Sequence, residues 1–247
     1  SKIIGVNIGL VVPSKTDWIW IKDLYTGINL ALDHFGGLIL GGDCSVGKEK
    51  VISMTALGKQ GEIKLRRNSC KPNEIILTTG IHGLSKLGLM IKSKTIFDSD
   101  IALSHSLINS SLQQFCRPKL KPKFLKKILK TRTNKSIKMI GCTDSSDGLF
   151  QALLDLATES NCKAIIDYAK VPKHKNWPTG NKWDEYYFFG GEDYELVFSL
   201  PRKWANNLLN EDKTITEIGY FLEGEVSVDF KNCDNKNLLK NKSFSHF

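Results

Sequence analysis

The sequence has no long hydrophobic run, and this absence excludes one class of protein. No apolar stretch in the 247 residues approaches the roughly 20 residues that a helix needs to cross a bilayer. We therefore expect no membrane-spanning helix and no membrane partner. The hydrophobic content of 41% is still large enough for a buried core, in one large domain or in two modest ones.

Paired cysteines are also missing. The chain has six cysteines, none of them in a C-x-x-C pair, and they stand at positions 44, 70, 116, 142, 162 and 233. This spacing argues against a zinc site. Scattered cysteines in a domain of ordinary size are typical of reduced thiols, so we expect a cytoplasmic protein.

Acidic residues are fewer than basic ones, which gives a net charge of +9. Much of the excess lies in residues 117–138, which contain ten basic residues and no acidic one. The segment could bind nucleic acid, but no aromatic residues alternate with the lysines to stack bases. We favour a solvated helix face and do not expect nucleic acid as a partner. In that helix the outward residues would be Lys123, Lys126, Lys127 and Lys130, and the inward ones Phe124, Ile128 and Leu129.

The hydrophobic patterns predict a mixture of helices and strands, that is, a layered α/β (α+β) fold. A strand at 3–12 is followed by a helix at 18–35, which begins after Asp17 and ends at Gly36-Gly37. The charged segment 62–71 is expected to link two domains. Further helices are expected at 85–92, 98–115 and 149–160. Further strands are expected at 38–40, 51–57, 74–79, 138–142, 164–168, 186–189 and 194–200, with a closing hairpin at 214–221 and 225–230.

A complete phosphate-binding P-loop is absent, although residues 39–50, ILGGDCSVGKEK, come close to one. Glu49 stands where the motif needs Ser or Thr, and a strand rather than a helix is expected to follow. The negative charge of Asp43 would repel a phosphate unless a cation lay between them. Asp43 can be a Mg²⁺ ligand on a tight Gly41-Gly42 turn at a strand end. It can also bond its own backbone in a plain turn, which this stretch alone favours.

A second acidic turn, TDSSDG at 143–148, precedes the helix expected at 149–160. Asp144 and Asp147 are three residues apart, so they can face one divalent cation that neutralises both charges. Ser146 can donate to a phosphate oxygen. The alternative is that one of these residues only caps the helix.

A third turn, GGEDYEL at 190–196, again combines glycines with acids. Glu192 and Asp193 could bind a cationic or hydroxylated ligand, or the stretch could be a plain hairpin turn. The three turns together indicate more than each does alone. Polyphosphate chemistry through bridging Mg²⁺ would explain all of them.

The three turns, in this order, resemble those of the thiamine-monophosphate kinases. GGEDYEL is the most specific, since the other two turns also occur in aminoimidazole ribonucleotide synthetase and selenophosphate synthetase. The resemblance implies a two-domain α/β architecture, with 1–64 as the remainder of an N-terminal ATP-binding and dimerisation domain and 65–247 as a C-terminal α/β domain. The matching stretches are GGD at 41–43, LRRNSCKPNEIILTTG at 65–80, DSSDGL at 144–149, GGEDYEL at 190–196 and FSHF at 244–247.

The resemblance also implies roles for individual residues. The Mg²⁺ ligands would be Asp43, Asp144 and Asp147. The nucleotide-binding residues would be Tyr25, Gly42, Asp43, Arg67 and Ser146. The thiamine moiety would be held by Glu192 and Phe244, and the aromatic face of Phe244 suits a cationic ring.

The implied reaction is Mg²⁺-dependent in-line transfer of the γ-phosphoryl group of ATP to thiamine monophosphate. The acceptor is already an anionic phosphate oxygen, so we expect neither a strong general base nor a covalent nucleophile. His82 is a tempting base, but the aspartate that the family usually carries near Leu84 is missing. We therefore interpret His82 as structural.

One departure from the family concerns the start of the chain. The family begins with a further stretch that includes a G-D-D motif, and this chain contains no G-D-D. We therefore expect an incomplete first domain, weak nucleotide binding and little catalysis by these residues, and a homodimer for the full-length protein. Two alternatives stay open, namely another ATP-using member of the superfamily and a non-catalytic module that binds through the basic segment.

Overall fold

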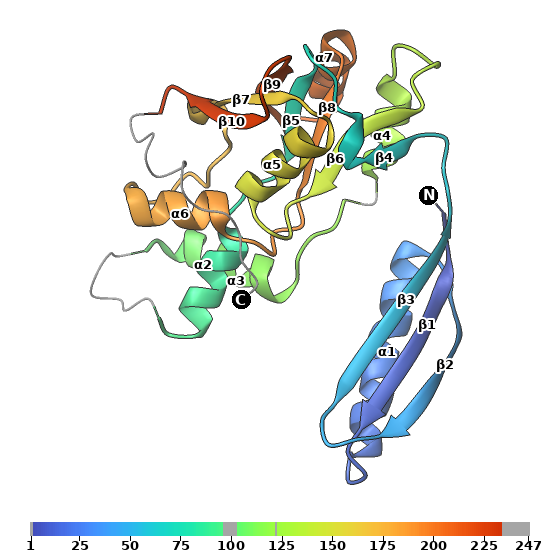
Figure 1. Ribbon diagram of the computed structural model, residues 1–247. Coiled ribbons are helices and arrows are strands. Elements are labelled where there is room, and N and C mark those ends of the chain that lie inside the picture. Colours follow the sequence, from blue (N-terminus) through green and yellow to red (C-terminus); the bar gives the residue numbers. More distant parts are fainter. Residues whose placement is uncertain (1, 96–102, 122, 234–247) are drawn as a thin grey trace. The chain divides into compact units, whose positions relative to one another are not determined.

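The structure is a computed structural model, and it describes residues 2–95, 103–121 and 123–233. Contacts divide the chain into two compact units, Ser1–Lys64 and Leu65–Phe247, each with a sheet of its own. The predicted class, a layered α/β fold, is confirmed, because helices pack on mixed sheets in both units (Figure 1). Within the described residues, no helix is both long enough and apolar enough to span a membrane.

The first unit is a three-stranded sheet with one helix. The strands follow the order β2-β1-β3, with β1 parallel to β2 and antiparallel to β3. Every second residue of β1 from Val6 to Val12 is buried, which gives the alternation expected of a half-covered strand. The elements are β1 (Lys2–Val12), α1 (Trp18–Phe35), β2 (Leu38–Val46) and β3 (Val51–Lys59).

Helix α1 begins and ends where the sequence predicts. The Asp17 carboxylate accepts a hydrogen bond of 2.9 Å from the backbone N–H of Ile19 and so caps the first turn. Gly36 has a φ of 91°, a left-handed value that favours glycine and ends the helix.

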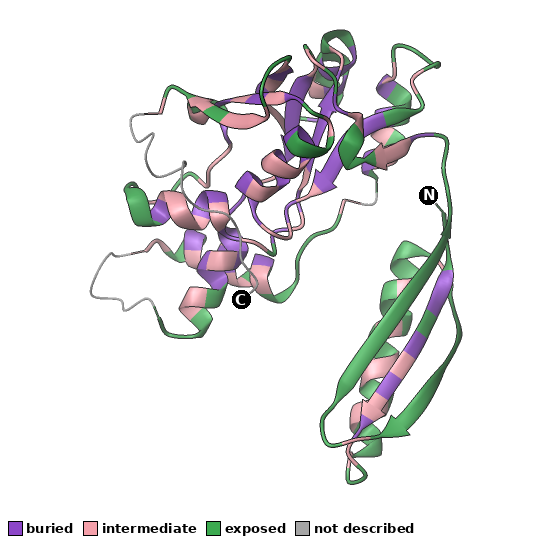
Figure 2. Ribbon diagram, in the orientation of Figure 1, coloured by how far each residue is buried: buried purple, intermediate pink, exposed green. Residues whose placement is uncertain are grey.

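Strand β2 corrects two predictions. A short buried strand and a tight Gly41-Gly42 turn were expected, but residues 38–46 form one continuous strand whose residues are all exposed (Figure 2). The strand pairs with β1 along its whole length, and the register shifts between Val6 and Asn7. A Cβ atom at Gly42 would lie 1.9 Å from the carbonyl oxygen of Ile8. Glycine therefore serves close approach of two backbones here, not a turn.

The second unit is a seven-stranded sheet in the order β10-β7-β9-β5-β8-β6-β4. Its strands are β4 (Lys64–Arg66), β5 (Ile75–Thr79), β6 (Met139–Asp144), β7 (Lys163–Asp167), β8 (Leu196–Leu200), β9 (Ile215–Leu222) and β10 (Ser227–Lys231). Its helices are α2 (Leu84–Lys92), α3 (His105–Cys116), α4 (Phe124–Thr131), α5 (Leu149–Glu159), α6 (Asn181–Phe189) and α7 (Arg202–Glu211).

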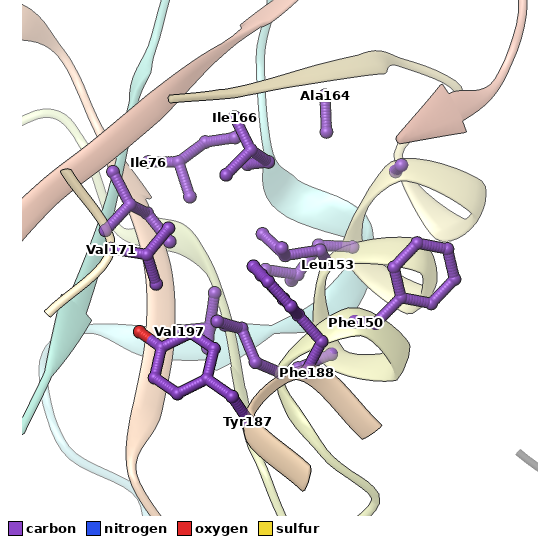
Figure 3. Packing of buried hydrophobic residues seen from close by; sticks show 14 of the residues in the cluster. Ile76, Phe150, Leu153, Ala164, Ile166, Val171, Tyr187, Phe188 and Val197 are labelled. Atoms are coloured by element: carbon purple, nitrogen blue, oxygen red, sulfur yellow. The ribbon is translucent and has the colours of Figure 1, made fainter. Parts of the chain in front are cut away.

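Hydrophobic residues on both faces of this sheet are covered. Val197 of β8 belongs to the cluster that Leu153 of α5 and Phe188 of α6 complete (Figure 3). The next residue of the same strand, Phe198, points to the other face and packs edge-on against Phe124 of α4, with 4.8 Å between ring centroids. Both faces of β8 are therefore buried, and four of its five residues are apolar.

Three predictions for the second unit are wrong or incomplete. Residues 186–189, expected as a strand, form the last turn of α6, because Trp183 and Tyr187, one helical turn apart, are both buried. The expected closing hairpin does not form, since β7 lies between β9 and β10 and pairs with both. Helix α7 lies in a segment for which no element was predicted. An aromatic run can form a strand or a helix, depending on what it packs against. Two strands that follow each other in the sequence need not pair with each other in the sheet.

The basic segment 117–138 contains α4, as the helix-face interpretation requires. Phe124 and Ile128 are buried, but Leu129 is exposed, contrary to expectation, because it lies about 100° further round the helix than Ile128. Two of the outward lysines form ion pairs near the end of α7. Lys127 contacts Asp212 at 2.5 Å, and Lys130 contacts Glu211 at 2.6 Å.

Candidate functional site

Two acidic loops of the second unit lie against each other. We call residues 144–148 the Asp144 loop and residues 190–195 the Glu192 loop. The backbone N–H of Ser145 donates to the Glu195 carbonyl at 2.8 Å, and the N–H of Glu192 donates to the Ser146 carbonyl at 2.8 Å. A Cβ atom at Gly191 would lie 2.1 Å from that same Ser146 oxygen, so the close approach requires glycine. Two stretches that are well separated in the sequence thus form one surface.

The two carboxylates of the Asp144 loop remain uncommitted. Asp144 is the last residue of β6 and Asp147 precedes α5, and both are half-buried. Among the described residues, neither side chain has a hydrogen-bond or ion-pair partner. The capping alternative is not borne out, because the N-cap of α5 is Gly148 and no side chain caps the helix. These acids are therefore available to a ligand.

Arg67 contacts Thr143, the residue that precedes the Asp144 loop. Its Nε donates to the hydroxyl of Thr143 at 3.1 Å, and Nη1 lies 3.2 Å from a carboxylate oxygen of Asp155. About half of the side chain, 52%, remains exposed. A guanidinium has five N–H donors, so these two contacts leave donors for an anion. Ser146, next to Asp147, is half-buried.

Asp193 of the Glu192 loop is committed to the protein itself. It is fully buried, and its carboxylate accepts hydrogen bonds from the backbone N–H groups of Gly83 at 2.5 Å and Ser85 at 2.9 Å. Burial raises the pKa of Asp193 to about 7. Of the two alternatives left open for Asp193, ligand binding is not borne out, because both its oxygens hold the start of helix α2.

Glu195, which the sequence did not single out, is the second buried acid of this loop. Its carboxylate accepts from the Thr79 hydroxyl at 2.5 Å and lies 3.1 Å from the ammonium of Lys121. A buried carboxylate needs such partners, since an unpaired charge would be costly. The sequence offers one signal that Glu195 is buried. Residues 193 and 195 are two positions apart, so in an extended segment their side chains point to the same side.

Glu192 and Tyr194 turn to the opposite side from the buried acids. Glu192 is exposed and Tyr194 is half-buried, and the phenol of Tyr194 donates to a Glu192 carboxylate oxygen at 2.5 Å. This hydrogen bond is the main reason that the pKa of Tyr194 is raised to about 12, and the charges of Asp144 and Asp147 contribute. Tyr194 therefore lies close to both loops' uncommitted acids.

His82 is buried and lies outside this surface. Its Nε2 is 2.7 Å from the Thr78 hydroxyl, and its Nδ1 has no partner among the described residues. Burial lowers the pKa of His82 to about 3, so the ring is neutral. A buried, neutral ring agrees with the structural interpretation.

The remaining candidates lie elsewhere. Tyr25 is half-buried on α1 and Asp43 is exposed on β2, both in the first unit. The Asp43 carboxylate accepts from the Ser45 hydroxyl at 3.1 Å and lies beside Gly9 of β1. Phe244 lies outside the described residues.

The donor set fits a magnesium ion better than a metal held by protein alone. In the described ranges there is no group of three or more His, Cys, Asp or Glu side chains that could hold a metal. Magnesium usually binds one or two carboxylates and takes its other ligands from water and phosphates. Asp144 and Asp147 meet that requirement, since both are uncommitted oxygen donors on one short loop.

A family model and a curated relative both match most of this chain. The family model of the AIR synthase related protein, C-terminal domain, matches residues 71–231. Thiamine-monophosphate kinase from Prochlorococcus marinus is 38% identical over 247 residues, which are 100% of this chain and 74% of that protein.

Solved structures share the fold. AaThiL complexed with AMPPCP and TMP has a TM-score of 0.77 at 24% identity, and the match covers 99% of this chain and 74% of that one. E. coli HypE, a hydrogenase maturation protein, has a TM-score of 0.72 at 13% identity, covering 100% and 75%. At these identities the likeness shows the fold, and it confirms the predicted two-domain architecture.

Proposed function

Because the chain belongs to the thiamine-monophosphate kinase family, we propose that it transfers the γ-phosphoryl group of ATP to the phosphate of thiamine monophosphate, giving thiamine diphosphate and ADP. The observation that carries this proposal is the 38% identity to a kinase of that name along the whole chain. The likeness to HypE favours no second function, because at 13% identity it concerns the fold alone.

The Asp144 loop supports a reaction between two anions. The acceptor is itself a phosphate oxygen, so the protein needs to hold the reactants in line and offset their repulsion rather than abstract a proton. Arg67 would contribute a permanent positive charge beside this loop, and Ser146 would donate a hydrogen bond to a phosphate oxygen.

Asp144 and Asp147 would hold magnesium, and Asp43 would be a magnesium ligand of the first unit. When bound, the ion would neutralise phosphate charge between donor and acceptor. Tyr25 and Gly42 would contact the nucleotide. Substitution of each of these residues would test its role.

Glu192 would hold the thiamine moiety of the acceptor. Its side chain is the exposed acid of the Glu192 loop, and thiamine offers an amino group and a cationic ring. Phe244 would stack on the same moiety. Nucleic acid has no place in this proposal, since Lys127 and Lys130 of the basic segment already pair with acids near α7.

The experiment that tests the proposal incubates the full-length protein with Mg²⁺, ATP and thiamine monophosphate. We expect thiamine diphosphate and ADP in equal amounts by chromatography, with no product from an aminoimidazole ribonucleotide precursor. Thiamine monophosphate binding is measured in parallel by calorimetry. A folded full-length protein that neither binds nor phosphorylates thiamine monophosphate would overturn the proposal.

We also propose that the protein is a homodimer that associates through its first unit. Among the residues that the structure describes, 14 of the 18 exposed large hydrophobic ones lie in that unit. Leu38 and Leu57, both exposed, flank Gly5 on one face of the sheet. Such a surface is larger than isolated apolar residues would give and is typical of an interface.

The free thiols of all six cysteines suit a cytoplasmic location.

Sedimentation of the full chain tests the dimer. We expect a dimer whose dissociation constant rises strongly in Leu57→Asp, while Leu89→Asp, at an exposed site in the second unit, has no such effect. A monomer at all concentrations, or equal behaviour of both variants, would contradict the proposal.

A further inference from the structure

The Glu192 loop is divided by alternation into two pairs of residues. Asp193 and Glu195 point inward, where backbone N–H groups, a hydroxyl and an ammonium hold their carboxylates. Glu192 and Tyr194 point outward and bond to each other at 2.5 Å. No partner from outside the loop is found for either outward side chain within the described residues.

The backbone that presents this outward pair is held in an unfavourable conformation. Glu192 has a φ of 68° and Tyr194 a φ of 52°, both in the left-handed region that residues with a Cβ rarely adopt. Each costs on the order of 1 kcal/mol and persists only where surrounding contacts impose it. Two such residues in one short loop are unusual for a plain turn, which would use glycine or asparagine.

Contacts on both sides of the loop impose this conformation. The Glu192 carbonyl accepts from the Ser85 hydroxyl at 2.7 Å, and the Asp193 carbonyl accepts from the Gln114 amide at 2.7 Å. The Glu195 N–H donates to the Ser145 hydroxyl at 3.2 Å. The loop is thus fixed from helix α2, helix α3 and the Asp144 loop, and its outward side chains start from a fixed position.

We propose that Tyr194 is a positioning residue that fixes the direction of the Glu192 carboxylate for the thiamine moiety of the acceptor. The proposal rests on the proposed function. The phenol occupies one carboxylate oxygen, which leaves the other oxygen to accept a hydrogen bond from an amino group or to pair with a cationic ring. The negative charges of Asp144 and Asp147 repel the Glu192 carboxylate. The hydrogen bond from the phenol keeps that carboxylate from rotating away from them.

Removal of the phenol oxygen alone tests this role. In Tyr194→Phe we expect the dissociation constant and KM for thiamine monophosphate to rise about tenfold, as for loss of one hydrogen bond to a charged group. KM for ATP should change less than twofold. The matched control is Tyr220→Phe, on β9, whose ring contacts Lys231 and whose loss of an oxygen should change neither constant.

A double-mutant cycle with Glu192→Gln separates positioning from direct contact. If Tyr194 acts only through Glu192, the double variant should bind thiamine monophosphate as weakly as Glu192→Gln alone. Additive losses would overturn the proposal, since they would mean that Tyr194 contacts the substrate independently.

Tyr194→Asn separates positioning from stability. Asparagine tolerates the left-handed region, so we expect an unchanged or higher midpoint of thermal unfolding together with weaker thiamine monophosphate binding. A lower midpoint with equal loss for both substrates would show a structural role and overturn the proposal. An unchanged dissociation constant in Tyr194→Phe, with binding by the unaltered chain, would overturn it while the proposed function stands. No binding by the unaltered chain would overturn both.

Discussion

The Asp144 loop and the Glu192 loop contain similar residues but use their acids differently. In the Glu192 loop, Asp193 and Glu195 are buried and each carboxylate has two protein partners. In the Asp144 loop, Asp144 and Asp147 are half-buried, and the described residues supply neither with a partner. This contrast separates the acids that stabilise the fold from the acids that are available to a ligand.

Burial without partners would be costly for a carboxylate, so the buried acids of the Glu192 loop must be satisfied by the protein. Two unpartnered like charges on one loop are also unfavourable, because each destabilises the other until a cation neutralises both. We infer that the first arrangement stabilises the folded chain and that the second sacrifices some stability for binding.

The largest expected effect comes from Asp144→Asn. This variant should lower kcat/KM for thiamine monophosphate phosphorylation on the order of 100-fold, as for removal of one electrostatic contact to a transition state. Its stability toward urea should be unchanged or higher, because one of two like charges is gone. Asp229→Asn, an exposed acid of β10 that pairs with Lys163, is the control and should retain activity. Equal activity of both variants would contradict the comparison.

The next effect is expected from Asp193→Ala. Loss of this carboxylate leaves two buried N–H groups at the start of α2 without an acceptor, which should lower the free energy of unfolding by about 2–3 kcal/mol. Glu192→Ala removes an exposed acid from the same loop and should change stability by less than about 0.5 kcal/mol. Urea unfolding measures both, and similar losses would show that burial does not separate the two acids.

The smallest effect near neutral pH is a pH dependence of stability that His82 imposes. Burial lowers the pKa of His82 to about 3, so below pH 6.5 the unfolded chain binds a proton that the folded chain does not. The contribution to stability is present above pH 6.5 and is lost as the pH falls toward 3, by up to about 1.4 kcal/mol per pH unit. His82→Gln should flatten this part of the curve of unfolding free energy against pH. An unaltered slope would mean that His82 is protonated in the folded chain.

Local signals make part of the fold predictable. The positions of strand β1 and helix α1 follow from alternation, the Asp17 cap and Gly36, all of which act over a few residues. The course of β2 through Gly41 and Gly42 does not, since glycine permits both a turn and close backbone approach. The position of β7 between β9 and β10 is also not predictable, because the sequence of a strand does not determine which strands pair with it.

The candidate site is predictable to a similar degree. Asp144 and Asp147 stand out in the sequence because two carboxylates on one short loop repel each other unless a cation lies between them. For Asp193 the sequence leaves open a ligand contact or a plain turn, and it does not reveal that this residue holds α2, because burial depends on helices far away in the sequence. That Glu192 is exposed while Asp193 is buried follows from the direction of the loop, which only the packed structure fixes.

A metal-binding measurement can show whether Asp144 and Asp147 form the cation site, and it does not depend on turnover. Mn²⁺ can replace Mg²⁺ as an oxygen-bound ion and is detected by electron paramagnetic resonance. With a non-hydrolysable ATP analogue present, the unaltered chain and Glu192→Gln should bind Mn²⁺ alike, whereas Asp144→Asn/Asp147→Asn should lose most of the bound signal. Equal Mn²⁺ binding by the double variant would contradict the assignment of these two acids as the cation site.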